Sequence, residues 1–381
     1  MNRSFLFALA LLLHALVGWR LVPDLPGPAG LALAGLLAVS AVLMPLALVM
    51  RRQAGDGATA RALSWAGMLC MGLFSSLFVL TVVRDVGLLA LLGFGRLWPL
   101  AADMAHVHSA TASAVVAIAG LVTLLGLWNA RRTAAVVTVD VPVTDLPASL
   151  EGFTIAQLSD VHVGPTIGRR YLEAIVARVN AMDADAVAIT GDLVDGSVPQ
   201  LAAHVAPLAA LRSRHGTFFV TGNHEYYSGA HAWIAELRRL GLTVLLNQHV
   251  VLDDGAGARP LVLAGVTDVT AHVFDPAHRS DPARALAGSP PDAVRVLLAH
   301  QPRSATAAER AGFDVQLSGH THGGQFWPWN LFVPLQQPFV AGLARLGRLR
   351  IYTSRGTGYW GPPKRLGAPS EITRVRLVRA A

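Results

Sequence analysis

Four long apolar stretches occupy the first 130 residues of this 381-residue chain, and they constrain its fold more than any other feature. They lie at about 5–22, 29–50, 62–83 and 110–130. The second and third run for 22 residues without a charged side chain, and the fourth runs for 21. About 20 apolar residues span the hydrocarbon core of a membrane as a helix, whereas a helix in a soluble core usually keeps a polar face. The pattern therefore predicts about four membrane-spanning helices.

The first stretch is the weakest, because His14 and Arg20 interrupt it. A signal peptide is the alternative there, although no small-residue cleavage site clearly follows. The run 86–95 is too short to cross a membrane and is predicted to be interfacial or re-entrant, within an outer loop at 84–109. A sensor or transporter built on the helices is a further alternative. Intramembrane ionisable residues usually mark a transport path, and these stretches offer little beyond His14.

The arginines between the apolar stretches predict the orientation in the membrane. With the N-terminus inside, the inner segments hold Arg3, Arg51, Arg52, Arg61, Arg131 and Arg132, and the outer ones hold only Arg20, Arg84 and Arg96. Arginine and lysine are enriched on the cytoplasmic side of membrane proteins. The pattern thus favours an inner N-terminus and, after four crossings, a cytoplasmic C-terminal part. We expect a multi-pass protein of a bacterial inner membrane that contacts membrane lipids.

The character of the sequence changes near residue 131. A linker is expected at 131–150, and 151–381 alternates short β-rich runs with amphipathic stretches, which is typical of an α/β domain. The single cysteine, Cys70, excludes an internal disulfide framework and a cysteine-based zinc site. The net charge of +7 is spread along the chain and is no clear nucleic-acid signature. Strands are expected at 153–158, 186–190, 217–221, 261–266, 294–299 and 315–318, and helices at 169–182, 230–240 and 304–311.

Five of these predicted strands run directly into polar residues that could bind a metal. In α/β sheets, the carboxyl ends of the strands are where ligands bind. One such residue alone has a structural explanation: a Gly-Asp pair usually makes a turn, and a lone histidine after a strand is usually hydrogen-bonded structure. Five independent strand ends with such residues favour a functional site. The residues that follow the five strands are Asp160 and His162; Asp192; Asn223, His224 and Glu225; His300; and His320 and His322.

The types of these side chains indicate the chemistry. Carboxylate, amide and imidazole groups without a thiolate suit Mn, Fe or Zn. One carboxylate, Asp192, can bridge two ions about 3.5–4 Å apart, and such a pair clamps a phosphate and activates a water molecule. The order Asp-x-His, Gly-Asp, Gly-Asn-His-Glu, His, Gly-His-x-His resembles the calcineurin-like metallophosphoesterase superfamily over about 151–378. The strings 190–196, 320–325, 355–358 and 365–372 are similar to its bacterial, membrane-associated branch.

The resemblance implies a four-layer α/β/β/α sandwich and a set of residue roles. Asp160, His162 and His322 would hold the first metal ion, Asp192 would bridge, and Asn223, His300 and His320 would hold the second. His224 would face the substrate and assist the leaving group. Glu225 stands where many members have aspartate and would orient His224. The resemblance implies a phosphohydrolase that cleaves a phosphodiester, phosphomonoester or pyrophosphate bond through a dinuclear metal-activated hydroxide.

The substrate is less constrained than the metal site. Trp327, Trp329 and Trp360 lie close to the last ligands in the sequence, and tryptophan is enriched at lipid interfaces, so a lipid-linked substrate is one hypothesis. A hydrophobic plug is the alternative for Trp327. Soluble nucleotides or nucleic acid are the alternative substrates for the same fold. Basic residues that could bind a second phosphate or a head group, or could simply be solvated, are Arg355, Lys364 and Arg365.

Overall fold

The computed structural model describes residues 3–50, 57–97, 103–252 and 259–380. By its internal contacts the chain divides into two units. The helical unit contains 1–129 together with Gly361–Lys364, and the sandwich unit contains 130–360 and 365–381. The boundaries expected from the sequence place all of 151–381 in one domain, so the four late residues in the helical unit are a difference from that expectation.

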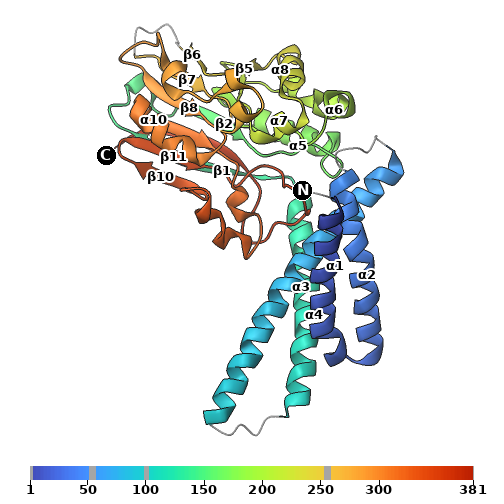
Figure 1. Ribbon diagram of the computed structural model, residues 1–381. Helices are drawn as coiled ribbons and strands as arrows, with labels where there is room; N and C mark the ends of the chain where they lie inside the picture. The colour runs from blue at the N-terminus through green and yellow to red at the C-terminus, as the bar shows by residue number, and fades with distance from the viewer. Residues whose placement is uncertain (1–2, 51–56, 98–102, 253–258, 381) are drawn as a thin grey trace. The chain divides into compact units, whose positions relative to one another are not determined.

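The helical unit consists of four long helices (Figure 1). All four are long and apolar enough to cross a membrane, which confirms the predicted helical region. A short 3₁₀ turn, η1 (Val22–Asp24), follows the first helix. The helices are α1 (Arg3–Leu21), α2 (Gly27–Met50), α3 (Ala58–Leu97) and α4 (Met104–Arg131).

The third helix continues through the place where the sequence predicts a loop. With 40 residues, α3 is about 60 Å long, twice the thickness of a bilayer core of about 30 Å. Its charged residues Arg84 and Asp85 do not end it, because each finds an opposite charge. Arg20 Nε donates to Asp85 Oδ2 at 2.8 Å, and Arg84 forms an ion pair with Asp24. The run 86–95, predicted as interfacial or re-entrant, is therefore a continuation of α3.

Lys364, the only lysine of the chain, is fully buried among the helices of the helical unit. Its ammonium has three donors and three acceptors: Gly72 O at 3.0 Å, Ser76 Oγ at 2.5 Å and Thr123 Oγ1 at 3.1 Å. Gly72 leaves room for this arrangement, because a Cβ on it would lie 3.2 Å from Pro362 Cβ. A buried charge is costly unless it is hydrogen-bonded, and here all three protons have partners.

Two six-stranded sheets form the centre of the sandwich unit (Figure 1). The first has the order β1-β12-β2-β3-β4-β5, and β2 to β5 run parallel. Its strands are β1 (Ala135–Val143), β12 (Glu371–Arg379), β2 (Thr154–Leu158), β3 (Ala186–Ile189), β4 (Thr217–Phe219) and β5 (Thr243–Val244). The second has the order β10-β11-β9-β8-β7-β6: β10 (Gly342–Leu346), β11 (Leu349–Thr353), β9 (Val315–Ser318), β8 (Val294–Leu298), β7 (Leu261–Gly265) and β6 (Gln248–Leu252).

The hydrophobic core shows that these sheets are the inner two of four layers. One core cluster joins the facing sheets, with Ile155 of β2 and Leu263 of β7 among its members. A second packs the first sheet against helices, as Leu172 shows, and a third packs the second sheet against others, as Ala308 shows. The predicted α/β/β/α sandwich is thus confirmed. Its helices are α5 (Arg169–Asn180), α6 (Val198–Val205), α7 (Asn223–Ser228), α8 (Ala230–Arg239), α9 (Pro282–Leu286) and α10 (Ala305–Ala311).

The stretch expected to be a linker contributes a strand to this sandwich. Within 131–150, β1 pairs in parallel with β12, from Ala135 opposite Glu371 to Val143 opposite Arg379. Valines alternate along β1, so Val141 and Val143 enter the core between the sheets. The strand is recognisable only with its distant partner, which lies at the other end of the domain sequence.

Gly72→Leu should destabilise the helical unit, because a larger side chain would collide with Pro362 and the stem of Lys364. Overpacking of this kind costs about 1–3 kcal/mol. Thermal unfolding of the full chain in detergent measures the change. The matched control is Gly87→Leu on the same helix, where a Cβ meets nothing within 4 Å. Equal melting temperatures for the two variants would contradict the described packing around Lys364.

Candidate metal centre

Every ligand predicted from the sequence lies at the carboxyl end of a strand in the sandwich unit. Asp160 and His162 follow β2, and Asp192 follows β3. Asn223 begins α7 shortly after β4, His300 follows β8, and His320 and His322 follow β9. The structure thus brings all seven side chains from both sheets to one edge of the sandwich. Asp160, Asp192 and His300 are each at most 2% exposed.

The backbone at these positions is strained in a consistent way. Five of the seven residues have φ between 52° and 70°, a region that side chains other than glycine adopt rarely: Asp160, His162, Asp192, His320 and His322. Such conformations cost about 1–3 kcal/mol each and cluster at functional sites. The turns also require close approach. A Cβ on Gly222 would lie 2.2 Å from Asp192 Oδ1, and one on Gly319 would lie 2.1 Å from Asp160 Oδ2.

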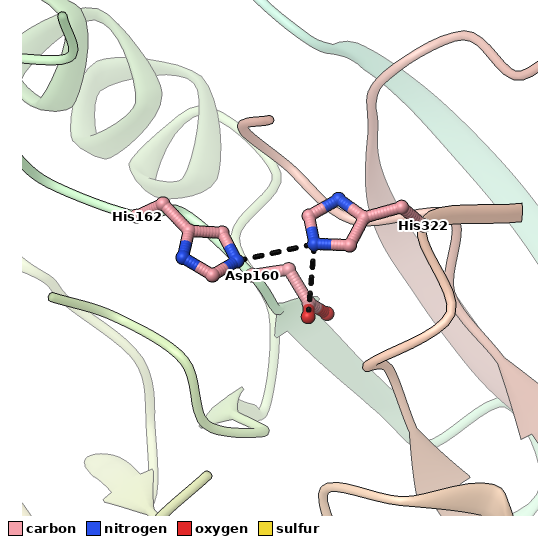
Figure 2. A group of neighbouring side chains, drawn as sticks. All are labelled: Asp160, His162 and His322. Carbon is pink, nitrogen blue, oxygen red and sulfur yellow. Dashed lines mark hydrogen bonds and ion pairs between the residues drawn. The ribbon is translucent and has the colours of Figure 1, made fainter. Parts of the chain in front are cut away.

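One half of the centre consists of Asp160, His162 and His322 (Figure 2). The Nε2 atoms of the two histidines are 3.1 Å apart, and His322 Nε2 is 3.5 Å from Asp160 Oδ1. The His162 ring donates through Nδ1 to Asp195 Oδ1 at 3.2 Å, which leaves Nε2 as an acceptor. Two ring nitrogens and a carboxylate oxygen converge on one point, as the ligands of a cation do.

The other half contains Asp192, His300 and His320. His300 Nε2 lies 3.2 Å from His320 Nδ1 and 3.1 Å from Asp192 Oδ2. The His300 ring donates through Nδ1 to the carbonyl of Thr190 at 2.8 Å, so its Nε2 is the nitrogen that faces the centre. Asp192 Oδ2 is 3.9 Å from His162 Nε2 as well, which places this carboxylate between the two halves.

The chemistry of these side chains fits divalent cations. Asn223 Oδ1 is buried and accepts no hydrogen bond from any described residue. A buried acceptor without a partner costs about 1–3 kcal/mol, so it indicates an absent donor or ion. The two groups of His and Asp side chains supply imidazole nitrogens and carboxylate oxygens, the ligands of Mn, Fe or Zn, and no thiolate. The residues present can therefore hold metal ions in both halves.

Burial and charge oppose each other in the metal-free centre. Burial by itself would raise the pKa of Asp192, but His300, His224 and His162 outweigh it and hold that pKa far below the ordinary value. Burial would likewise lower the pKa of His300, yet the Asp192 carboxylate raises it well above the ordinary value. For His320, burial and the His300 charge lower the pKa to about 4.

An acid that the sequence analysis gave no role, Asp195, orients His224. Asp195 Oδ1 accepts from His224 Nδ1 at 2.5 Å and also contacts His162 Nδ1. The remaining ring nitrogen, His224 Nε2, is 3.9 Å from Asp192 Oδ2 and so faces the metal centre. Asp195 belongs to the string 190–196 that already contains Asp192, but spacing alone does not show which imidazoles it reaches.

Glu225 has a different position from the one implied by the family pattern. Its carboxylate accepts from four backbone N–H groups, among them Leu193 at 2.8 Å and Gly222 at 2.7 Å. It thereby ties the loop after β3 to the start of α7. Burial and the nearby Asp192 charge raise the pKa of Glu225 to about 8. The backbone donors act in the opposite direction, because they favour the ionised carboxylate. Glu225 is thus a positioning residue for Asp192, and the hydrogen bond that orients His224 comes from Asp195.

The three basic residues predicted to contact substrate are engaged with the protein. Arg355 Nη1 forms an ion pair with Glu371 Oε2 at 2.7 Å. Arg365 is fully buried, and its guanidinium donates to the carbonyls of His322 and Arg355 and to Nδ1 of His322 at 3.0 Å. Lys364 belongs to the helical unit. These contacts give no support to direct substrate binding by Lys364 or Arg365, and they assign Arg365 to holding the His322 loop.

Comparisons with known proteins show the family to which the domain belongs. The calcineurin-like phosphoesterase family model matches residues 153–324. A protein of Bos taurus named transmembrane protein with metallophosphoesterase domain is 43% identical over 274 residues, which are 70% of this chain and 62% of the relative. An uncharacterised metallophosphoesterase of Aquifex aeolicus is 32% identical over 234 residues, 61% of this chain and 87% of the relative. An uncharacterised metallophosphoesterase of Campylobacter jejuni is 38% identical over 251 residues, which are 65% of this chain and 64% of the relative.

The sandwich unit is therefore a metallophosphoesterase domain, a class that uses divalent metal ions. The chain belongs to the calcineurin-like phosphoesterase family, and its four apolar helices make it a membrane protein. The match spans less than two thirds of the length of the bovine and Campylobacter relatives.

Asp192→Asn should remove bound metal and phosphoesterase activity together, because the neutral amide no longer balances the charge of bound cations. Metal content per chain, measured by elemental analysis of purified protein, and hydrolysis of bis-p-nitrophenyl phosphate provide the two readouts. His224→Ala should keep the metal and lose most of the turnover. Normal activity in Asp192→Asn, or lost metal in His224→Ala, would contradict the proposed roles.

Asp195→Asn should lower turnover by about 10–100-fold, the usual loss when a group that orients a metal-site histidine is changed. The amide still fills the space but no longer offers a charge to the two imidazoles. Assays in excess metal separate this loss from weaker metal binding. Asp183→Asn, at an exposed aspartate of the same domain, serves as the control. Full turnover in Asp195→Asn would show that the His224 contact is dispensable.

Proposed function

We propose that this protein is an integral-membrane phosphohydrolase with a dinuclear metal centre and a lipid-linked substrate. The bond cleaved would be a phosphodiester, phosphomonoester or pyrophosphate. The observation that carries the proposal is the convergence of buried acceptors in two groups, with Asp192 in one of them and 3.9 Å from His162 of the other, together with the partnerless Asn223 Oδ1. Asp160, His162 and His322 would hold one ion, and Asn223, His300 and His320 the other.

The side chains divide the work of the reaction. Two bound ions would neutralise phosphoryl oxygens and lower the pKa of a water molecule between them. Asp192 keeps the two halves at a fixed separation. The His224 ring, held through Nδ1 by Asp195, has Nε2 towards the centre and donates a proton to the departing oxygen. Its ring is 15% exposed, so a substrate can reach it while bulk water is largely kept away.

An exposed apolar patch beside the centre supports a lipid-linked substrate. From Gly323 to Ala344 the chain contains no charged residue, although 14% of all residues are charged. Trp327, for which a hydrophobic plug was the alternative, is 46% exposed, whereas its neighbour Phe326 is buried. Contiguous exposed apolar surface on such a domain marks an interaction site, and tryptophan favours the lipid interface. The side chains of this patch, each at least 43% exposed, are Trp327, Trp329, Leu331, Phe332 and Leu335.

Two aromatic rings border the proton donor itself. The Trp360 ring centroid is 5.9 Å from that of His224, and the Tyr227 centroid is 5.3 Å away. Gln325 holds Trp360 by two hydrogen bonds of 2.9 Å to its backbone, one from the amide nitrogen and one to the amide oxygen. Both rings are about half exposed. They form an apolar rim at His224, which suits a leaving group with a hydrocarbon part.

The arginine pattern supports an inner N-terminus and a cytoplasmic sandwich unit in a bacterial inner membrane. A fusion of green fluorescent protein to the C-terminus should fluoresce in a bacterial host, and a fusion of periplasmic alkaline phosphatase at the same point should be inactive. The reverse pair of results would place the sandwich unit outside the cytoplasm.

Detergent-solubilised protein loaded with Mn should hydrolyse lipid pyrophosphates in mixed micelles faster than cyclic nucleotides or bis-p-nitrophenyl phosphate. The comparison uses kcat/KM for each substrate with the same preparation. Cleavage of the soluble esters alone would reject the lipid-linked substrate and favour a phosphodiesterase of soluble nucleotides. A metal-loaded protein that cleaves none of the substrates would favour a sensor or transporter with a regulatory domain.

Leu331→Ser combined with Leu335→Ser should raise KM for a lipid substrate in vesicles by about tenfold or more, since each buried leucine contributes on the order of 1.5–3 kcal/mol. Turnover of bis-p-nitrophenyl phosphate should be unchanged, because neither residue is at the metal centre. Leu343→Ser is the matched control, an exposed leucine on β10 outside the patch. Equal effects of the double variant on lipid and soluble substrates would argue against interfacial contact.

A further inference from the structure

A second group of potential metal ligands lies in the sandwich unit outside the centre described above. It joins the first turn of α8 to a 3₁₀ turn, η5 (Pro276–His278), and consists of His231, Asp275 and His278. Asp275 Oδ2 is 3.1 Å from His231 Nε2 and 3.9 Å from His278 Nε2. Ligands at 2.0–2.2 Å from a tetrahedral zinc ion are separated by about 3.3–3.6 Å, which lies between these two distances.

Local hydrogen bonds engage one polar atom of Asp275 and one of His278, and they leave the other polar atom of each side chain available for a metal. Asp275 uses Oδ1 to accept from the backbone N–H of Ala277 at 2.9 Å, as the N-cap of η5, so Oδ2 faces the histidines. His278 Nδ1 is bonded to the hydroxyl of Tyr226 at 2.8 Å, so its Nε2 is directed to the same point. A hydrogen bond to the second ring nitrogen is the usual support of a metal-binding histidine.

The third side chain gives the group access to solvent. The side chain of His231 is 73% exposed, whereas the side chains of Asp275 and His278 are 26% and 13% exposed. One open ligand and two anchored ones let an ion enter without rearrangement of the fold and leave a position for water. Two imidazoles, one carboxylate and a water molecule form a common zinc coordination set.

We propose that His231, Asp275 and His278 bind a divalent transition-metal ion of the zinc class, separate from the proposed pair at Asp192. The inference goes beyond phosphoester hydrolysis, since this ion would take no part in the reaction. It would clamp the start of α8 to the turn at 275–278.

The clamp would act on the rim of the metallophosphoesterase centre. Residue Gly229, with φ of 96°, joins α8 directly to α7, the helix that begins with Asn223 and His224. Phe274 precedes the ligand Asp275 and packs against Tyr227, with ring centroids 5.6 Å apart. Tyr227 in turn contacts the His224 ring. An ion at His231 thus holds in place the aromatic side of the rim beside the proton donor.

Zinc content of the full chain in detergent tests this site. After removal of metals and dialysis against buffered zinc, wild-type protein should retain one more zinc per chain than His231→Ala or Asp275→Asn. Both changes are mild: His231 is exposed, and asparagine can still cap η5 through its Oδ1. The control is His272→Ala on η4 (Ala271–Val273), a histidine bonded to the Val269 carbonyl at 3.0 Å. Equal zinc content in wild type and both variants would overturn the proposal.

Combination with Asp192→Asn keeps this result distinct from the proposed dinuclear centre. Asp192→Asn should still bind one zinc, and the additional change His231→Ala should remove it, whereas His231→Cys, with a thiolate ligand, should retain it. If Asp192→Asn bound no zinc at all, the proposed site at His231 would be rejected and the proposed dinuclear centre would stand. If Asp192→Asn kept its full zinc content while His231→Ala lost one ion, the proposed dinuclear centre would be rejected and the proposed site at His231 would stand.

Discussion

The buried carboxylate of Asp192 lies within 4 Å of ring nitrogens from His162, His224 and His300. A buried charge of this kind is tolerated only beside positive charge or several donors. That requirement explains three unusual features around Asp192. Strained turns direct histidines towards its carboxylate, and the glycine at 222 makes room for it. Glu225 accepts hydrogen bonds from the backbone of the loop after β3 and from the start of α7. Cations satisfy the requirement best, because they also give the lone Asn223 oxygen a partner.

Much of the domain could be predicted because its evidence is local. Strands buried on both faces appear as short apolar runs, and the ligands follow at the ends of those runs, so β2, β3, β4, β8 and β9 could be located to within about two residues. What escaped prediction depends on distant pairing. The strand β1 is defined by β12, and the contact of Asp195 with two imidazoles depends on how three loops meet.

The helices show the same division between local and distant information. Hydropathy predicted four apolar helices, and the structure has a helix at each of these places, but hydropathy put the end of the third at Arg84, where a charge enters the apolar run. The structure carries the helix onward because Asp24 and Arg20, from another part of the chain, neutralise Arg84 and Asp85. Lys364 shows the same dependence, since a lone lysine near a phosphoesterase motif suggests an anion ligand, whereas its hydrogen-bond partners lie on distant helices that the local sequence does not reveal.

The four residues Gly361–Lys364 make the two units discontinuous in sequence. No single cut in the polypeptide separates the two units intact. A break after Asn129 leaves the helices without Lys364, which is buried among them. The same break leaves the other fragment with the segment Gly361–Lys364 but without the helices to which this segment belongs. Exchange of membrane anchors between relatives by simple recombination at the end of α4 would meet the same obstacle.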